Sequence, residues 1–173
     1  MKTLPTILLS TLLCACAGDM AVRIQVPQAQ SGQPLAQVKV TDLRVPGVAA
    51  SKREAAFGVP MGNITFHPPE AQLVKQLLEV ELTRRLRDQG VQTPRDYVCE
   101  IVEFGANTVT TPLYWDMVGR VQLVLKDGAR TYQLNGTHTE RTFVWPGEEL
   151  VMKVVGESLK QIAADLGPAA QGN

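Results

Sequence analysis

Residues 121–145, VQLVLKDGARTYQLNGTHTERTFVW, decide the fold class of this chain. Before residue 127, apolar and polar residues alternate, which is the period of a half-buried strand. Asp127-Gly128 is a strong signal for a tight hairpin turn, because glycine adopts the positive φ angles that such turns need. We therefore predict a strand over residues 116–126, the turn, and a long Thr-rich strand over residues 131–144.

Two amphipathic helices flank this hairpin in the sequence. The first is predicted over residues 70–89, where prolines precede it and Gly90 ends it. The second is predicted between Gly147 and Gly167, whose Gly-Pro step ends it. Each helix has one apolar stripe. The stripes consist of Leu73, Val74, Leu77, Leu78, Leu82 and Leu86, and of Val151, Val154, Val155, Leu159, Ile162 and Leu166.

Three further strands are expected over residues 37–45, 55–59 and 97–104, giving the order β-β-α-β-β-β-α. This order predicts an α+β fold, in which two helices pack on one face of a mostly antiparallel sheet of about four or five strands. The opposite face should be polar and partly exposed, and it should include Gln122, Gln133, Asn135, Thr137 and Thr139.

The N-terminus resembles a lipoprotein signal. Lys2 precedes an apolar run over residues 4–13, which is too short to span a bilayer. The run ends in LCAC, which resembles the lipobox that precedes an acylated cysteine, here Cys16. An ordinary secretory signal cleaved after Ala15 or Ala17 is the alternative. We expect a signal peptide over residues 1–15, a lipid anchor and flexible tether over 16–35, one domain over 36–167, and a frayed end over 168–173. Within the tether, Val22, Ile24 and Val26 alternate with polar residues and could form a short strand.

Charge and composition exclude several function classes. Loss of Lys2 with the signal changes 17 basic and 17 acidic residues to 16 and 17, a net charge of −1. Such a balance gives no electrostatic reason to expect nucleic acid as a partner. Neither His67 nor His138 has the neighbouring ligands that a metal site needs, and we expect no metal and no cofactor. Cys99 should be buried in its strand. No catalytic motif is present, so no enzyme is expected.

Bulky apolar side chains concentrate in two connections of the expected sheet. Leu113, Tyr114 and Trp115 lie between the third and fourth strands, and Trp145 lies where the fifth strand meets the second helix. These side chains either fold back to close the core or form a contact surface. In the second case the partner would be another protein or a second copy of the chain, since aromatic residues are favoured interface anchors.

The chain resembles the YajG-type family of uncharacterised outer-membrane lipoproteins from about Val38 to Leu166. The segments that carry the resemblance are VKVTDLR, LVKQLLEVELTRRLRDQG, the hairpin quoted above and MKVVGESLKQIAADL. The resemblance implies a location and an architecture, because the family is not known for an enzymatic activity. The GVPMGN stretch departs from the family pattern and is left unassigned.

Three functions compete for such a chain. The favoured one is a non-enzymatic interaction or assembly module, anchored in the bacterial outer membrane and facing the periplasm. The second is an accessory subunit of an envelope transport or export machine, such as a lipid ABC transporter or a polysaccharide-export ring. The third is an enzyme acting on cell-wall or lipid material. Ala17 follows Cys16 where inner-membrane retention signals have Asp, which favours the outer membrane over the inner membrane.

We predict that Cys16 becomes the acylated first residue of the mature chain. The intact mass of protein extracted from membranes should match a chain that begins at Cys16 and carries added acyl groups. A Cys16→Ser variant should lose this mass and leave the membrane fraction, because stable attachment needs more than one lipid chain. A variant that kept both the added mass and the membrane association would contradict the prediction.

Overall fold

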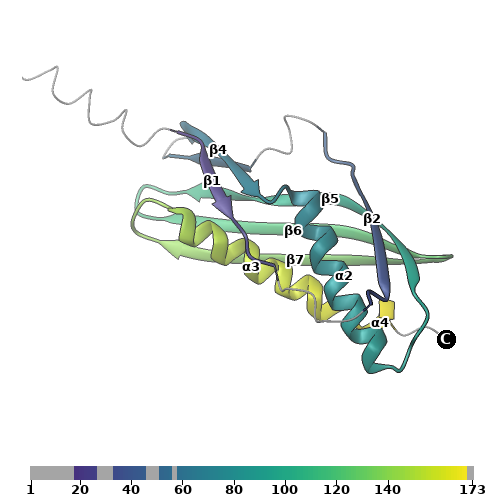
Figure 1. The fold of residues 1–173 in the computed structure, drawn as a ribbon. Coiled ribbons are helices and arrows are strands. Elements are labelled where there is room, and N and C mark those ends of the chain that lie inside the picture. Colours follow the sequence, from purple (N-terminus) through teal and green to yellow (C-terminus); the bar gives the residue numbers. More distant parts are fainter. Residues whose placement is uncertain (1–17, 27–32, 46–50, 56–57, 171–173) are drawn as a thin grey trace, which may run out of the picture.

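The computed structural model describes residues 18–26, 33–45, 51–55 and 58–170. Two sheets and two long helices make up the described chain (Figure 1). A three-stranded sheet has the order β1-β4-β3, and a four-stranded sheet has the order β2-β5-β6-β7. The strands are β1 Met20–Arg23, β2 Ala36–Asp42, β3 Ser51–Glu54, β4 Pro60–His67, β5 Arg95–Thr110, β6 Trp115–Asp127 and β7 Arg130–Thr142. The helices are α2 Glu70–Asp88, α3 Glu148–Asp165 and α4 Gly167–Ala170.

The α+β class is confirmed, but the single mostly antiparallel sheet is replaced by two mixed sheets. β5, β6 and β7 form an antiparallel meander with Gly128 in the predicted hairpin turn. β2 pairs in parallel with β5, and β1 pairs in parallel with β4. A parallel pair needs a long crossover connection. Between β2 and β5 this connection contains β3, β4 and α2.

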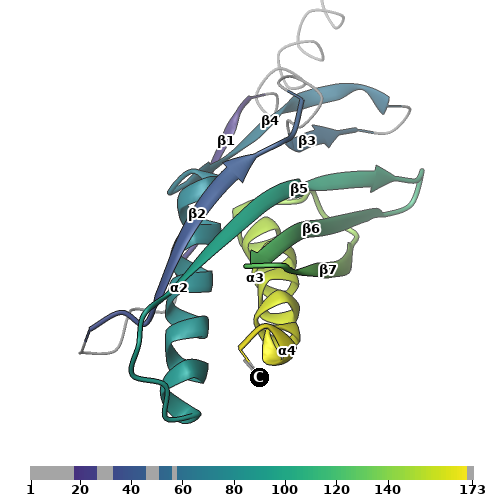
Figure 2. The same cartoon turned by 90° about the vertical axis from the view of Figure 1, so that its right-hand side faces the viewer.

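Both long helices cover one face of the four-stranded sheet (Figure 2). α2 packs against β2, and α3 packs against β6 and β7. Every residue of the two predicted apolar stripes is buried, as is Cys99, so both helix predictions are confirmed. The opposite face of the sheet carries the expected polar residues, and Gln122, Gln133, Asn135, Thr137 and Thr139 are all exposed there.

The predicted strand over residues 55–59 is wrong. Strands form on either side of it, at β3 and at β4, whose residues PMGNITF were left without a strand in the prediction. Gly62 within β4 has a φ of 117°, but residues 63–67 after it alternate between exposed and buried side chains. This period of two is a local strand signal that the prediction did not use. Residues 56–57 lie outside the described part of the chain.

Folded structure extends beyond residues 36–167 at both ends. Within the expected tether, the possible strand around Val22 forms as β1, where Val22 is fully buried and Ile24 after it is 7% exposed. At the other end α4 buries Ala169 and Ala170, so residues 168–170 are not frayed. Residues 1–17, with Cys16, lie outside the described residues, as do residues 27–32 and 171–173. None of the described helices is long and apolar enough to cross a membrane.

The backbone of α3 touches the sheet directly. A Cβ atom added to Gly119 of β6 would lie 2.6 Å from the carbonyl oxygen of Val154, and one added to Gly136 of β7 would collide with the carbonyl of Ser158. The buried Ser158 hydroxyl lies 3.1 Å from the Gly119 carbonyl oxygen and 2.8 Å from that of Val154. The absence of side chains at these two positions therefore sets the distance between helix and sheet.

We predict that Gly136→Ala lowers the free energy of unfolding by about 2–3 kcal/mol, because the added methyl group must displace α3 from the sheet. Gly156→Ala is the matched control, since Gly156 lies in α3 and a Cβ there meets nothing within 4 Å. This control should be neutral or more stable by up to about 1 kcal/mol, from helix propensity alone. Urea unfolding measures both, and equal stabilities for the two variants would contradict the close contact.

Candidate functional site

The candidate interface residues lie together at one end of the four-stranded sheet, which we call the aromatic end. It consists of Leu113, Tyr114, Trp115, Phe143, Val144 and Trp145. The β5–β6 turn is fixed by Thr111, whose amide donates to the Tyr114 carbonyl at 2.9 Å. The Thr111 hydroxyl oxygen also accepts the amides of Leu113 and Tyr114, at 3.3 and 3.0 Å. These bonds hold Leu113 at the tip of the turn, where it is 79% exposed.

Edge-to-face aromatic pairs join the β5–β6 turn to the segment after β7. Tyr114 and Phe143 have ring centroids 6.2 Å apart, and those of Trp115 and Trp145 are 5.7 Å apart. Such pairs contribute about 0.5–1.5 kcal/mol beyond the burial of their area. The two segments, residues 113–115 and 143–145, therefore form one surface although they lie far apart along the chain.

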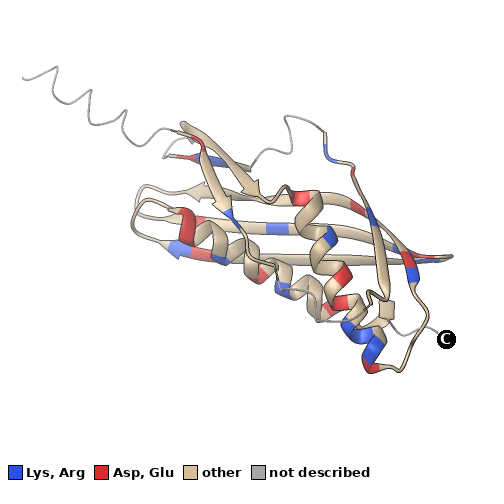
Figure 3. Cartoon of the chain, viewed as in Figure 1, with Lys and Arg blue, Asp and Glu red and all other residues tan. Residues whose placement is uncertain are grey.

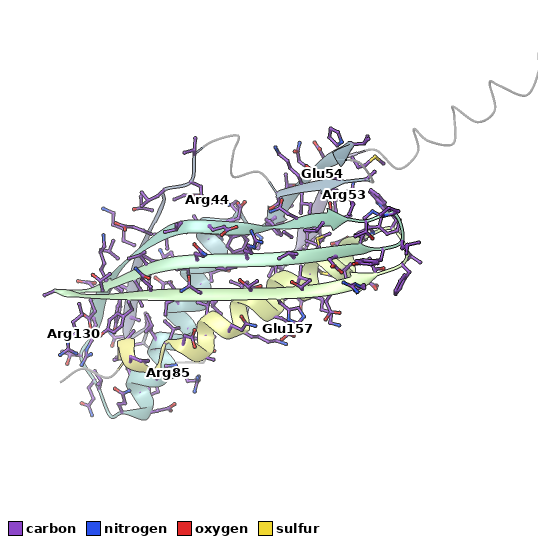
Figure 4. All side chains as sticks on the ribbon, turned by 180° about the vertical axis from the view of Figure 1, so that it is seen from behind. Arg44, Arg53, Glu54, Arg85, Arg130 and Glu157 are labelled. Atoms are coloured by element: carbon purple, nitrogen blue, oxygen red, sulfur yellow. The ribbon has the colours of Figure 1, made fainter. Side chains whose placement is uncertain are left out.

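Two arginines contact the aromatic rings of this surface. The Arg141 guanidinium lies 3.8 Å from the centroid of the Tyr114 ring and donates to the Asp116 carboxylate at 2.8 and 3.0 Å. These hydrogen bonds from Arg141 lower the pKa of Asp116 below its ordinary value. Arg53 of β3 lies 5.8 Å from the Trp145 ring, and its Nη2 donates to the carbonyl of Gly18. Arg53, which is labelled in Figure 4, thus links Trp145 to the first described residue.

The aromatic end divides into a half-buried base and an exposed tip. Trp115 and Trp145 are only partly exposed, and the indole nitrogen of Trp115 is buried without a hydrogen-bond partner among the described residues. Leu113, Phe143 and Val144 are 79%, 73% and 72% exposed. Of the four residues singled out from the sequence, Leu113 therefore lies at the exposed tip, whereas Tyr114, Trp115 and Trp145 are half-buried. Phe143 and Val144, which adjoin Trp145 in the sequence, complete the tip.

The remaining candidates for chemistry are separated from one another. His138 pairs with Glu140 at 2.9 Å, and His67 is exposed at the end of β4. Within the described ranges, no group of three or more His, Cys, Asp or Glu side chains is placed to hold a metal ion. Burial raises the pKa of the Cys99 thiol to about 12, so this thiol stays protonated and unreactive at neutral pH.

Comparisons with known proteins bear on the fold. No family model matches the chain, and no curated protein matches it. The crystal structure of an uncharacterized protein is similar to it, with 14% sequence identity and a TM-score of 0.50. The match covers 88% of this chain and 99% of the other. At this low identity the similarity shows a shared fold and nothing about activity.

We predict that Leu113→Ala changes the free energy of unfolding by less than about 0.5 kcal/mol, because the side chain is exposed at the tip. Trp115→Ala should cost about 2 kcal/mol or more, since it removes the edge-to-face contact with Trp145 and leaves a gap. Urea unfolding of both variants separates tip from base. A large loss for Leu113→Ala, or none for Trp115→Ala, would contradict this division.

Proposed function

We propose that this protein is a non-enzymatic lipoprotein, anchored through an acylated Cys16 at the periplasmic side of the outer membrane. Its domain acts there as an interaction or assembly module. The LCAC segment supports the anchor, and the resemblance to YajG-type lipoproteins supports the location. The aromatic end is the contact surface of the module.

The observation that carries this proposal is the exposure of the aromatic end. Three large apolar side chains, Leu113, Phe143 and Val144, each leave more than two thirds of their surface to solvent. They are held in place by a bonded turn and by ring contacts, so their exposure is built into the fold. Contiguous apolar surface of this kind marks binding sites, and aromatic residues are common anchors there.

The charged residues of the neighbouring sheet face are largely committed to one another. Arg141 pairs with Asp116, Arg120 with Glu103, and Lys126 with Glu100, all across adjacent strands. Paired exposed charges of this kind contribute little to stability, but they keep a sheet face solvated. We therefore place the proposed contact surface at the aromatic end and not on this face of the sheet.

Site-specific crosslinking in intact cells tests the proposal. A photoreactive amino acid at position 113 should form adducts with another envelope component, either a protein or a lipid, whereas the same amino acid at Ala129 should not. Ala129 is the matched control because it is also exposed in a hairpin turn, at the opposite end of the sheet. Equal adducts from both positions, or none from position 113, would rule out a contact function for the aromatic end.

A further inference from the structure

We propose that the aromatic end rests in the headgroup region of the same membrane that holds the lipid on Cys16. This inference depends on the acylation put forward under the proposed function, and it names what covers the contact surface. It follows from where the folded chain begins, what lies beside that point, and which side chains are exposed there.

The folded structure begins only two residues after Cys16. The Gly18 amide donates to the Met61 carbonyl at 3.1 Å, and the Asn63 amide donates to the Asp19 carboxylate at 2.9 Å. Gly18 also fits against Gly62, where an added Cβ atom would collide with the Gly18 carbonyl. Because two residues span at most about 7 Å, the Cα atom of Cys16 must lie within that distance of Gly18. A lipid on Cys16 therefore holds the domain against the bilayer.

The end of the molecule that meets the bilayer is the aromatic end. Arg53 bonds to the Gly18 carbonyl on one side and lies 5.8 Å from the Trp145 ring on the other. Through this residue, the Cα atom of Cys16 lies no more than about 20 Å from the Trp145 ring. The hairpin turn at Gly128 is farther away, because the 13 residues of β6 extend for about 40 Å. Figure 4 shows Arg53 and Arg130 at opposite ends of the sheet.

The exposed side chains at this end suit a lipid interface. Of the nine large apolar side chains exposed in the described chain, Leu113, Phe143 and Val144 belong to the aromatic end, and Val109 lies beside it, opposite Asp116. The half-buried rings of Tyr114, Trp115 and Trp145 lie next to these exposed side chains. Tryptophan and tyrosine are enriched at the membrane–water interface, where one part of the ring is apolar and the other is wet. The two-residue connection to Cys16 confines the aromatic end to the bilayer. A protein partner at this end would therefore have to share it with the lipid.

Apolar burial, and not charge, drives this contact. Lys, Arg, Asp and Glu are spread over the helices and strands, with both signs interspersed (Figure 3). The net charge of the chain after loss of Lys2 is −1, which gives no attraction to anionic lipids. The contact should therefore persist in high salt, which screens exposed charges but does not weaken apolar burial.

The test uses the full mature chain, with acylation of Cys16 verified by intact mass, in vesicles of phosphatidylethanolamine and phosphatidylglycerol. Leu113→Cys carries an environment-sensitive thiol probe, and Ala129→Cys carries the same probe as the matched control. Cys99 stays unlabelled because it is buried. On transfer from detergent to vesicles, quenching of the probe at 113 by aqueous iodide should fall by about threefold or more, as for groups that enter the headgroup region. Quenching at 129 should not change.

The two tryptophans of the chain give a second readout, because both lie at the aromatic end. Their emission should shift to shorter wavelength in vesicles, and the shift should disappear in a Leu113→Ser/Phe143→Ser double variant. An acylated chain whose probe at 113 stays open to iodide would overturn this inference alone. Shielding at 113 that grows with the number of chains per vesicle would assign the end to a second copy and overturn it as well. A chain without acyl mass would overturn the proposed function together with the inference.

Discussion

The fold depends on how closely α3 approaches β6 and β7. At Gly119 and Gly136 the helix backbone lies on the backbone of the sheet, and Ser158 fills the remaining space with a hydroxyl that stays within hydrogen-bonding distance of carbonyls from both elements. This approach buries the whole apolar stripe of α3 against the sheet. α2 packs beside α3 on the same face of the sheet. Arg85 of α2 donates to the carbonyls of Ala163 and Ala164 at the end of α3. A cation at that end is favoured by the helix dipole.

Hydroxyl side chains from neighbouring elements accept hydrogen bonds from strand amides that have no partner strand. β2 is an edge strand, and the Thr83 hydroxyl of α2 accepts the amides of Leu35 and Ala36, both at 3.1 Å. Ser51 in β3 accepts the amide of Ala106 at 3.0 Å, where β5 has extended beyond its pairing with β2. Covering an edge in this way prevents pairing with another chain. The three-stranded sheet is thereby fixed beside the far half of β5, and with it Arg53 and the start of the folded chain.

The elements that the sequence predicted well are those whose signal is local. Both long helices and the hairpin around Gly128 follow from periodicity and turn chemistry within single segments. The three-stranded sheet was missed because its pairing is not local: Val22 of β1 lies opposite Phe66 of β4, and neither short strand has a stable partner within its own segment. For the same reason the alternation of Val22, Ile24 and Val26 suggests a short strand but not the strand with which it pairs. At the aromatic end, the sequence identified the two loops. Which side chains are half-buried and which are exposed depends on contacts between the loops, such as that of Trp115 with Trp145, which a single segment does not show.

The revised start of the domain changes what the anchor can do. With a coil of about 20 residues the domain would sit about 25 Å from the lipid and could turn freely. With β1 paired to β4 and Gly18 bonded to Met61, the proposed lipid and the domain share one orientation. Under the proposed acylation, the aromatic end would face the membrane and the polar sheet face would stand roughly along the membrane normal. The hairpin turn at Gly128 would then project about 40 Å from the bilayer, which is the length of β6 and β7. In that orientation, any component on the same side of the membrane would meet the same sheet edges and the same turn each time.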